Sequence, residues 1–465
     1  NTDTPKGHPK GSKMAVEFIP VDRDSPYIFP PCVQDYLADD HLARFVVDIV
    51  EQLDLSHLSA AYSGRGSRPF HPALLVSLLF YGYATGVFSS RKLEKASYDS
   101  IAFRYICANT NPDHDTIASF RKRFLKELGA LFVEILVVGE ALGLVKLGTV
   151  SLDGTKIKAN ASKHKALSWE YANRLEAQLK REVEELMRLG EEADQRSRPE
   201  AMDIPEELKR REERLAAIAR AKEKIRARAQ ERFEREQAEF EAKQARREAR
   251  EKETGKKPRG KAPSPPTPGP QAKDQVNLTD EESRIMPSAS GGFEQAYNAQ
   301  AGVDIQTHLI VEQHVTQHTN DKQEIEPALE AIGQLPQALG EAEKLLADTG
   351  YFSETNVEKC TKAHLVPFIP EKRDKHNCPL MERFREDPEP PRNATAVQAM
   401  KHRLQTREGE ALYAKRKSTV ETVFGIIKQV QGFRQFLLRG LDSVQSEWSL
   451  VCIGWNLKRM HALRG

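Results

Sequence analysis

Hydrophobic residues recur at helical spacing from residue 27 to 145, where strand-like alternation is scarce. The most apolar segment, HPALLVSLLFYGYATGV, predicts a core helix shorter than the roughly 20 residues that cross a membrane. Two more helices follow, and Asp115 is placed to cap the second. A short polar turn joins them as in a helix-turn-helix, with Arg121, Lys122 and Arg123 on or near the exposed second helix. An ordinary helical bundle with a solvated basic face is the alternative.

The pattern changes after residue 146. Residues 147–158 predict a β-strand that carries Asp153 in its middle. Residues 166–255 are dominated by Glu, Lys, Arg and Ala with a thin apolar stripe, which predicts a coiled-coil-like helical hairpin. Its nearly balanced charge favours a solvated hairpin with ion pairs over a clamp for DNA. Residues 255–270, GKKPRGKAPSPPTPGP, indicate a flexible basic linker.

Strand signals return from residue 291. GGFEQAYNAQAGVDIQTHLIVEQHVTQ predicts a hairpin, and DKQEIEPALEAIGQL, KLLADTGYFS, TNVEKCTKA and HLVPFIP predict helix, strand, helix and strand. Residues 371–412 look polar and irregular, and residues 413–431 and 442–462 predict amphipathic helices. With the insertion removed, three strands precede an alternation of helix and strand. That order predicts an α/β, ribonuclease-H-like mixed sheet flanked by helices.

These patterns divide the chain into five parts. We expect a disordered leader at 1–26, a helical domain at 27–145, a ribonuclease-H-like core at 146–165 and 271–440, a charged helical insertion with a Pro-rich linker at 166–270, and a C-terminal helix at 441–465.

Composition adds limits to this picture. The 465 residues are 39% hydrophobic, which is enough for buried cores, and 30% charged. The net charge of +2 does not indicate a nucleic-acid binder, so local basic clusters would have to supply that contact. Five sparse cysteines fit a reducing cytosol. Cys360, His364, His376 and Cys378 could bind zinc, but they lack the paired short loops of a zinc ribbon.

Three acids lie on different predicted elements. Asp153 is within the first strand, Asp348 ends the fourth strand, and Glu421 is on the helix of YAKRKSTVETVFGIIKQV. Carboxylates from separate elements can hold two Mg²⁺ ions about 3.5–4 Å apart for phosphoryl transfer. Each acid could instead be a cap or an ion-pair partner, and Lys417 and Glu421 have the spacing of a helix-surface pair.

The combination of SLDGTKIKANAS, ESRIM…GGFEQAYNAQAGVD, TNDKQEIEPALEAI, LLADTGYFS and ETVFGIIK resembles the bacterial insertion-sequence transposases of the DDE class. The resemblance covers nearly everything from about residue 25 to the end. It implies that Asp153, Asp348 and Glu421 are the catalytic metal ligands, with two Mg²⁺ ions that Mn²⁺ can replace. Tyr413, Arg416, Glu421 and Lys428 are similar to a Tyr-Arg-Glu-Lys signature of one subgroup. Arg416 is one residue too far upstream, and Lys417 occupies the expected position.

The resemblance also implies an activity and its partners. We expect a cytoplasmic, nucleoid-associated enzyme that binds the terminal inverted repeats of its own element, cleaves the DNA ends and joins them to target DNA. Tyr413, Arg416, Lys417 and Lys428 would contact double-stranded DNA near the site, and the helical domain would bind DNA through Arg121, Lys122 and Arg123. Pairing of two ends implies a homodimer, and no membrane partner is expected. A catalytically inactive DNA-binding descendant and a nuclease of the same fold are the alternatives.

A few further residues have two interpretations each. Asp321 could be an additional acid near the site, although DKQE favours a helix cap. His308, His314 and His318 are interpreted as surface or phosphate-proximal side chains. Arg434 and Arg439 could contact DNA or lie in a solvated loop. Trp448 and Trp455, seven residues apart on the last helix, are expected in the core.

Overall fold

The structure is a computed structural model that describes residues 32–62, 69–162, 165–195, 204–255, 260, 262–288, 291–372 and 386–465. The predicted leader, residues 1–26, lies outside the described residues. Among the residues that the structure describes, no single helix is long and apolar enough to span a membrane. One pair of helices, Pro72–Thr85 and Ser90–Asp99, is long and apolar enough when taken together, but the two meet at 95°.

The first part of the chain is helical. Its elements are η1 Val33–Tyr36, α1 Leu42–Val50, α2 Ser56–Ala60, α3 Pro72–Thr85, α4 Ser90–Asp99, α5 Ile101–Ile106, α6 His114–Arg123 and α7 Leu125–Ala141. Helix α3 starts with Pro72 in its first turn and ends at Gly86, whose φ of 83° is the left-handed conformation that favours glycine. The cap of α6 is Asp113, whose carboxylate accepts from the Thr116 amide at 2.8 Å, so the prediction that Asp115 caps this helix is wrong.

A six-stranded mixed sheet forms the centre of the molecule. Its strands are β1 Thr149–Lys158, β4 Arg284–Pro287, β5 Phe293–Asp304, β6 Ile310–Thr316, β7 Lys344–Leu346 and β8 Val366–Phe368. The order is β4-β5-β1-β7-β8, with β6 also paired to β5. Strand β1 runs antiparallel to β5 and parallel to β7, which is parallel to β8. The fold is therefore mixed α/β, as predicted.

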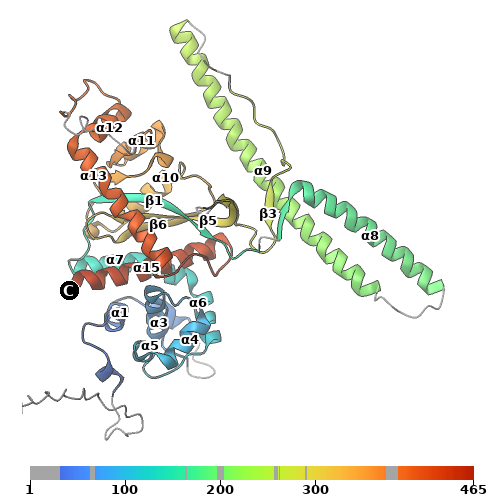
Figure 1. The fold of residues 1–465 in the computed structure, drawn as a ribbon, viewed down its shortest axis with the longest axis horizontal. Helices are drawn as coiled ribbons and strands as arrows, with labels where there is room; N and C mark the ends of the chain where they lie inside the picture. Colours follow the sequence, from blue (N-terminus) through green and yellow to red (C-terminus); the bar gives the residue numbers. More distant parts are fainter. Residues whose placement is uncertain are drawn as a thin grey trace, which may run out of the picture.

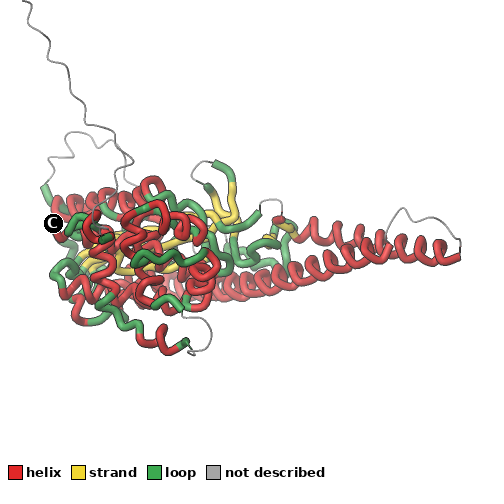
Figure 2. Tube along the Cα trace, turned by 90° about the horizontal axis from the view of Figure 1, so that it is seen from below, coloured by secondary structure: helices red, strands yellow, loops and turns green. Residues whose placement is uncertain are grey.

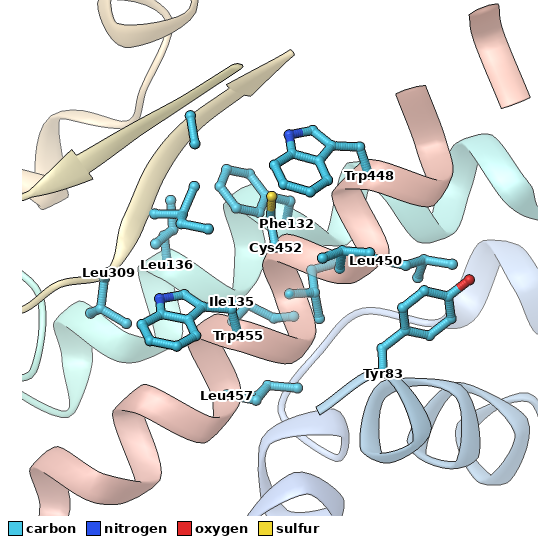
Figure 3. Packing of buried hydrophobic residues seen from close by; sticks show 14 of the residues in the cluster. Tyr83, Phe132, Ile135, Leu136, Leu309, Trp448, Leu450, Cys452, Trp455 and Leu457 are labelled. Carbon is cyan, nitrogen blue, oxygen red and sulfur yellow. The ribbon is translucent and has the colours of Figure 1, made fainter. Parts of the chain in front are cut away.

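Helices cover both faces of this sheet. α10 Ile325–Gly333 and α11 Glu354–Lys362 lie on one side, and α7 and the last helix, α15 Leu441–Arg464, lie on the other (Figure 1). Figure 3 shows α15 packed between the sheet, α7 and α3, with Trp448 and Trp455 inside this layer. The two indoles are 0% and 6% exposed, so their prediction as core residues is confirmed. This layer ties the N-terminal helices to the sheet.

The charged insertion projects from the sheet as a long arm (Figure 2). β2 Ala166–Ser168 pairs with β3 Gln275–Asn277 at its base, and α8 Trp169–Gln195 packs against α9 Ile204–Thr254. Ile218 and Ile225 of the predicted apolar stripe are each 1% exposed in a small separate core. Ion pairs such as Lys222 with Glu176 join the two helices. The expected helices and their ion pairs are thus present.

The segment before α15 departs from the prediction in two ways. Residues 371–412 are not wholly irregular, because α12 Ala396–Gln405 and the start of α13 Arg407–Ser418 lie there. The helix predicted over 413–431 is broken. It comprises the end of α13, then α14 Val420–Gly425 and a π-helical turn, η6 Ile426–Val430, and Thr419 interrupts it with φ −104° and ψ −92°. This break has a direct effect on the candidate site.

Candidate active site

Asp153 lies near the middle of the central strand β1, opposite Ala301 of β5. Its side chain is 18% exposed, and Oδ1 accepts from the Gly154 amide at 2.9 Å. Burial raises its pKa to about 6, Arg416 opposes that rise, and the nearby charge of Asp348 adds to it. A carboxylate in a buried strand therefore depends on a positive charge held next to it.

Arg416 supplies that charge and connects two of the predicted acids. Its Nη1 is 3.0 Å from Asp153 Oδ2, and its Nη2 is 2.9 Å from Glu421 Oε1. The Arg416 side chain is 12% exposed and that of Glu421 is 46% exposed. Burial alone would lower the pKa of Arg416, but the charges of Asp153, Tyr413 and Glu421 raise it. The guanidinium therefore stays charged between the two carboxylates.

The break at Thr419 explains why Arg416 forms this pair. In a continuous α-helix the neighbours of Glu421 one turn earlier are three or four residues away, which would select Lys417. Because the chain turns at Thr419 between α13 and α14, the residue five positions earlier, Arg416, reaches Glu421 instead. The one-residue offset seen in the sequence is thus compensated by the backbone.

Asp348 follows β7 and caps the short helix η4 Thr349–Tyr351, accepting from the Gly350 amide at 2.7 Å. Strand β7 is parallel to β1, with its last residue Leu346 beside Ser151, so Asp348 follows β7 at about the level of Asp153. The charge of Asp348 raises the pKa of Asp153, which reflects this proximity. In parallel sheets the carboxyl ends of strands are the usual place for ligands.

Lys428 approaches the same strand from the π-helical turn. Its Nζ donates to Thr155 Oγ1 and to the Lys156 carbonyl, the latter at 3.2 Å. Burial lowers the pKa of Lys428, and Asp153 opposes that change. Tyr413 is half-buried on α13, close enough to Arg416 to affect its pKa, and Lys417 is exposed. The four signature residues therefore surround the Asp153 side of β1.

The donor set is chemically suited to a hard divalent cation, because carboxylate oxygens are its preferred ligands. In the described part of the chain, no three His, Cys, Asp or Glu side chains are already arranged as a metal site. The guanidinium of Arg416 is instead the cation between Asp153 and Glu421. Asp153 and Glu421 thus bind a positive charge together, and a metal ion would have to compete with Arg416 for these two carboxylates.

Asp321 lies near Asp153, and its contacts differ from the helix cap that the sequence pattern suggested. The cap of α10 is Glu324, so the prediction that Asp321 caps this helix is wrong. Its Oδ1 accepts from Asn298 at 2.6 Å, from Gln300 at 2.8 Å and from Lys156 at 3.2 Å. It also raises the pKa of Asp153. The acid in TNDKQE was the sequence signal for a carboxylate near the site, but its interpretation as a helix cap pointed to a different role.

The three basic residues of α6 differ from one another. Arg121 is 8% exposed and donates to the Phe88 carbonyl at 3.0 Å, so its expected exposure is wrong. Lys122 is exposed. Arg123 is also exposed, while its guanidinium donates to the Ala61 carbonyl and lies 5.2 Å from the Tyr62 ring centroid. Lys122 and Arg123 stay candidates for DNA contact, whereas Arg121 serves internal packing.

Two other groups of residues need correction or qualification. His314 and His318 contact the buried carboxylate of Glu324, at 3.0 and 2.7 Å. The His318 side chain is 43% exposed, as predicted for a surface residue, whereas that of His314 is only 17% exposed. Burial would lower the pKa of His314, but Glu312 and Glu324 raise it to about 10. Of the four possible zinc ligands, Cys360 is buried and His364 is exposed, while 376 and 378 are outside the described residues. Arg439 donates to the Asn160 carbonyl at 2.9 Å.

Two segments of the chain match models of known protein families. Residues 31–123 match the model of a transposase domain (DUF772), and residues 357–461 match that of a transposase DDE domain. These two matches indicate an insertion-sequence DDE transposase. No curated protein and no solved structure matches it. The DDE match covers Arg416, Glu421 and Lys428 of this transposase, whereas Asp153 and Asp348 precede the matched segment.

Proposed function

We propose that this transposase binds the terminal inverted repeats of an insertion sequence, cleaves the DNA ends and joins them to target DNA. The observation that carries the proposal is the meeting of Asp153 and Glu421 on one guanidinium, with Asp348 close enough to Asp153 to raise its pKa. Two-metal phosphoryl transfer requires several carboxylates close together, and these contacts support that arrangement for the three acids.

Asp153, Asp348 and Glu421 would hold the divalent ions. A pair of Mg²⁺ ions, or Mn²⁺ in their place, would supply the positive charge that activates the attacking oxygen and stabilises the leaving one. The chain's own contribution would be to bring together three carboxylates from β1, the β7 turn and α14. Burial of Asp153 limits access of bulk water to that site.

Basic residues around the acids would orient the DNA. Arg416, Lys417 and Lys428, with the Tyr413 hydroxyl, are grouped on α13 and the following turn, where they would meet backbone phosphates. Lys122 and Arg123, exposed on α6, would contact the repeat farther from the chemistry. Phosphate contacts of this kind supply affinity that falls as salt increases.

We also assign the sheet to the ribonuclease-H-like class. The order β6-β5-β1-β7-β8, with antiparallel β5 and β6 and parallel β1, β7 and β8, supports this assignment. The division into a helical DNA-binding part, a sheet core and the α8–α9 arm is part of the same proposal, as is a homodimer that holds two ends together.

The test is incubation of the purified transposase with duplexes that carry the repeats flanking its gene, with and without Mg²⁺, followed by sequencing of the products. The proposal expects Mg²⁺-dependent cuts at the repeat ends and joined molecules when target DNA is present. Cuts without joined products would indicate a nuclease of the same fold. Binding without cuts in either Mg²⁺ or Mn²⁺ would indicate a DNA-binding protein and overturn the proposal.

A further inference from the structure

Asp321 is held at the centre of a hydrogen-bond network that joins it to two strands of the core. Its Oδ1 accepts from Lys156 of β1 and from Asn298 and Gln300 of β5. The Asp321 side chain is 22% exposed. A carboxylate that accepts three donors from two strands fixes its own position and the orientations of the donor side chains.

Gly154 makes this close approach possible. A Cβ at position 154 would lie 2.6 Å from Asp321 Oδ1 and 2.9 Å from Asn298 Oδ1, closer than real Cβ contacts come. Gly154 directly follows Asp153, so the strand that carries the buried acid is open on its other face to admit Asp321. The sequence Asp153–Gly154 therefore places one carboxylate on one face of the strand and leaves room for the Asp321 carboxylate on the other face.

Gln300 transmits the position of Asp321 to the turn that carries Asp348. Its Nε2 donates to Asp321 Oδ1, and its Oε1 accepts from the Tyr351 hydroxyl. A carboxylate can only accept, so it forces the amide of Gln300 to present its NH₂ to Asp321 and its oxygen to Tyr351. Without Asp321 this amide is free to flip, and Tyr351 would then face a donor.

Tyr351 is the anchor of the Asp348 turn. It is 0% exposed and ends the short helix η4 that Asp348 caps. Its carbonyl accepts from Asn356 of α11 at 2.7 Å, so the residue is held at both its side chain and its backbone. Loss of the Gln300 contact would leave a buried hydroxyl unsatisfied, which costs stability next to Asp348.

We infer that Asp321 is a positioning residue that fixes the Asp348 turn through Gln300 and Tyr351. The expected effect of Asp321 on the cleavage rate rests on the proposed function. Its effect on the position of the Asp348 turn does not. Asp321 acts through other residues, so its removal should change the placement of Asp348 rather than the binding of DNA. Outer hydrogen-bond partners of metal-binding residues typically alter activity by about 10- to 100-fold.

The experiment compares Asp321→Ala, Tyr351→Phe and the double variant in the full chain. The first readout is hydrogen–deuterium exchange of the peptide spanning the Asp348 turn, which needs no DNA and no metal. Exchange should be faster than in the wild type in all three variants. Unchanged exchange in Asp321→Ala would overturn the inference, whatever the fate of the proposed function.

The second readout is the rate of end cleavage. Asp321→Ala should lower kcat by roughly 10- to 100-fold and leave the KM for DNA unchanged. Since both residues act along one path, the double variant should lose little more than the worse single variant. If the fold-loss of kcat in the double variant equals the product of the two single losses, Asp321 acts independently of Tyr351, and the proposed path is overturned. If wild type itself fails to cleave, the proposed function fails, and the exchange result still decides the inference.

Asp280 provides a matched control. Its Oδ1 accepts from the buried Tyr297 hydroxyl at 2.9 Å and from the Gly440 amide at 3.3 Å, so its bonds run away from the Asp348 turn. Asp280→Ala likewise removes an aspartate that holds a buried tyrosine, in this case by a direct hydrogen bond. Faster exchange of the Asp348 turn in this control as well would show a general loosening of the core and contradict the specific role of Asp321.

Discussion

Arg416 donates a hydrogen bond to Asp153 across 3.0 Å, between residues 263 positions apart in the chain. The same guanidinium holds Glu421 at 2.9 Å. The two carboxylates are therefore paired with an internal cation. Any metal ion that uses both of them has to compete with Arg416, and an anionic phosphate that binds Arg416 would favour the metal.

Removal of Arg416 should therefore strengthen metal binding to the protein without DNA. We expect Arg416→Gln to bind Mn²⁺ about 10-fold more tightly than wild type, which corresponds to about 1.4 kcal/mol. The measurement is a Mn²⁺ titration followed by electron paramagnetic resonance. Lys417→Gln is the control, because Lys417 is exposed and Arg416 makes the contact with Glu421. Equal or weaker Mn²⁺ binding by Arg416→Gln would contradict the competition.

Gly154→Ala should destabilise the fold, because the added Cβ would meet the oxygens of Asp321 and Asn298. We expect a loss of about 1–3 kcal/mol in the free energy of unfolding, the range of overpacked cores. Urea denaturation monitored by circular dichroism measures it. Gly148→Ala is a matched control on the same chain segment, since a Cβ there would have no neighbour within 4 Å. Similar stabilities for the two variants would refute the close packing at Gly154.

Glu447 of α15 should make the stability of the fold depend on pH. It is 0% exposed and accepts from the Leu437 and Leu438 amides, each at 3.0 Å. Burial raises its pKa to about 7, with the Leu438 bond and Arg121 opposing the rise. A carboxyl whose folded pKa is raised contributes stability that is fully present below its unfolded pKa of about 4.5 and is lost as the pH rises through about 7.

The corresponding variant is Glu447→Gln, which cannot ionise. The melting temperature of wild type relative to this variant should fall as the pH is raised from 5 to 8 at fixed ionic strength. Differential scanning calorimetry at several pH values measures the difference. A constant difference over this range would show that Glu447 has the same ionisation in the folded and unfolded chains.

The three acids are predicted from the sequence because each stands in a recognisable element: a strand centre, a strand end and an amphipathic helix. Their role as metal ligands stays a prediction. The placement of Asp348 near Asp153 depends on the parallel pairing of β1 with β7. The break at Thr419 is not predicted from the sequence, because continuous helical periodicity does not reveal a local change of φ and ψ. For that reason Lys417 was a candidate where Arg416 makes the contact.

Two other sequence predictions, the cap at Asp321 and the exposure of Arg121, are wrong for similar physical reasons. DKQE has the spacing of a capping box, yet the three donors from β1 and β5 hold Asp321 elsewhere and leave Glu324 as the cap. Arg121 follows the exposed pattern of its basic neighbours, but long-range contact with the Phe88 carbonyl buries it. Contacts between residues far apart in the chain decide both positions, and local patterns cannot report them.

The most direct test of the central claim is DNA cleavage by Asp153→Asn, Asp348→Asn and Glu421→Gln, each compared with wild type on duplexes carrying the repeat ends. We expect Mg²⁺-dependent strand cleavage to fall below detection in all three, while binding of the ends measured by gel shift stays within a few-fold of wild type. Wild-type cleavage by any one of these variants would remove that residue from the site and contradict the account.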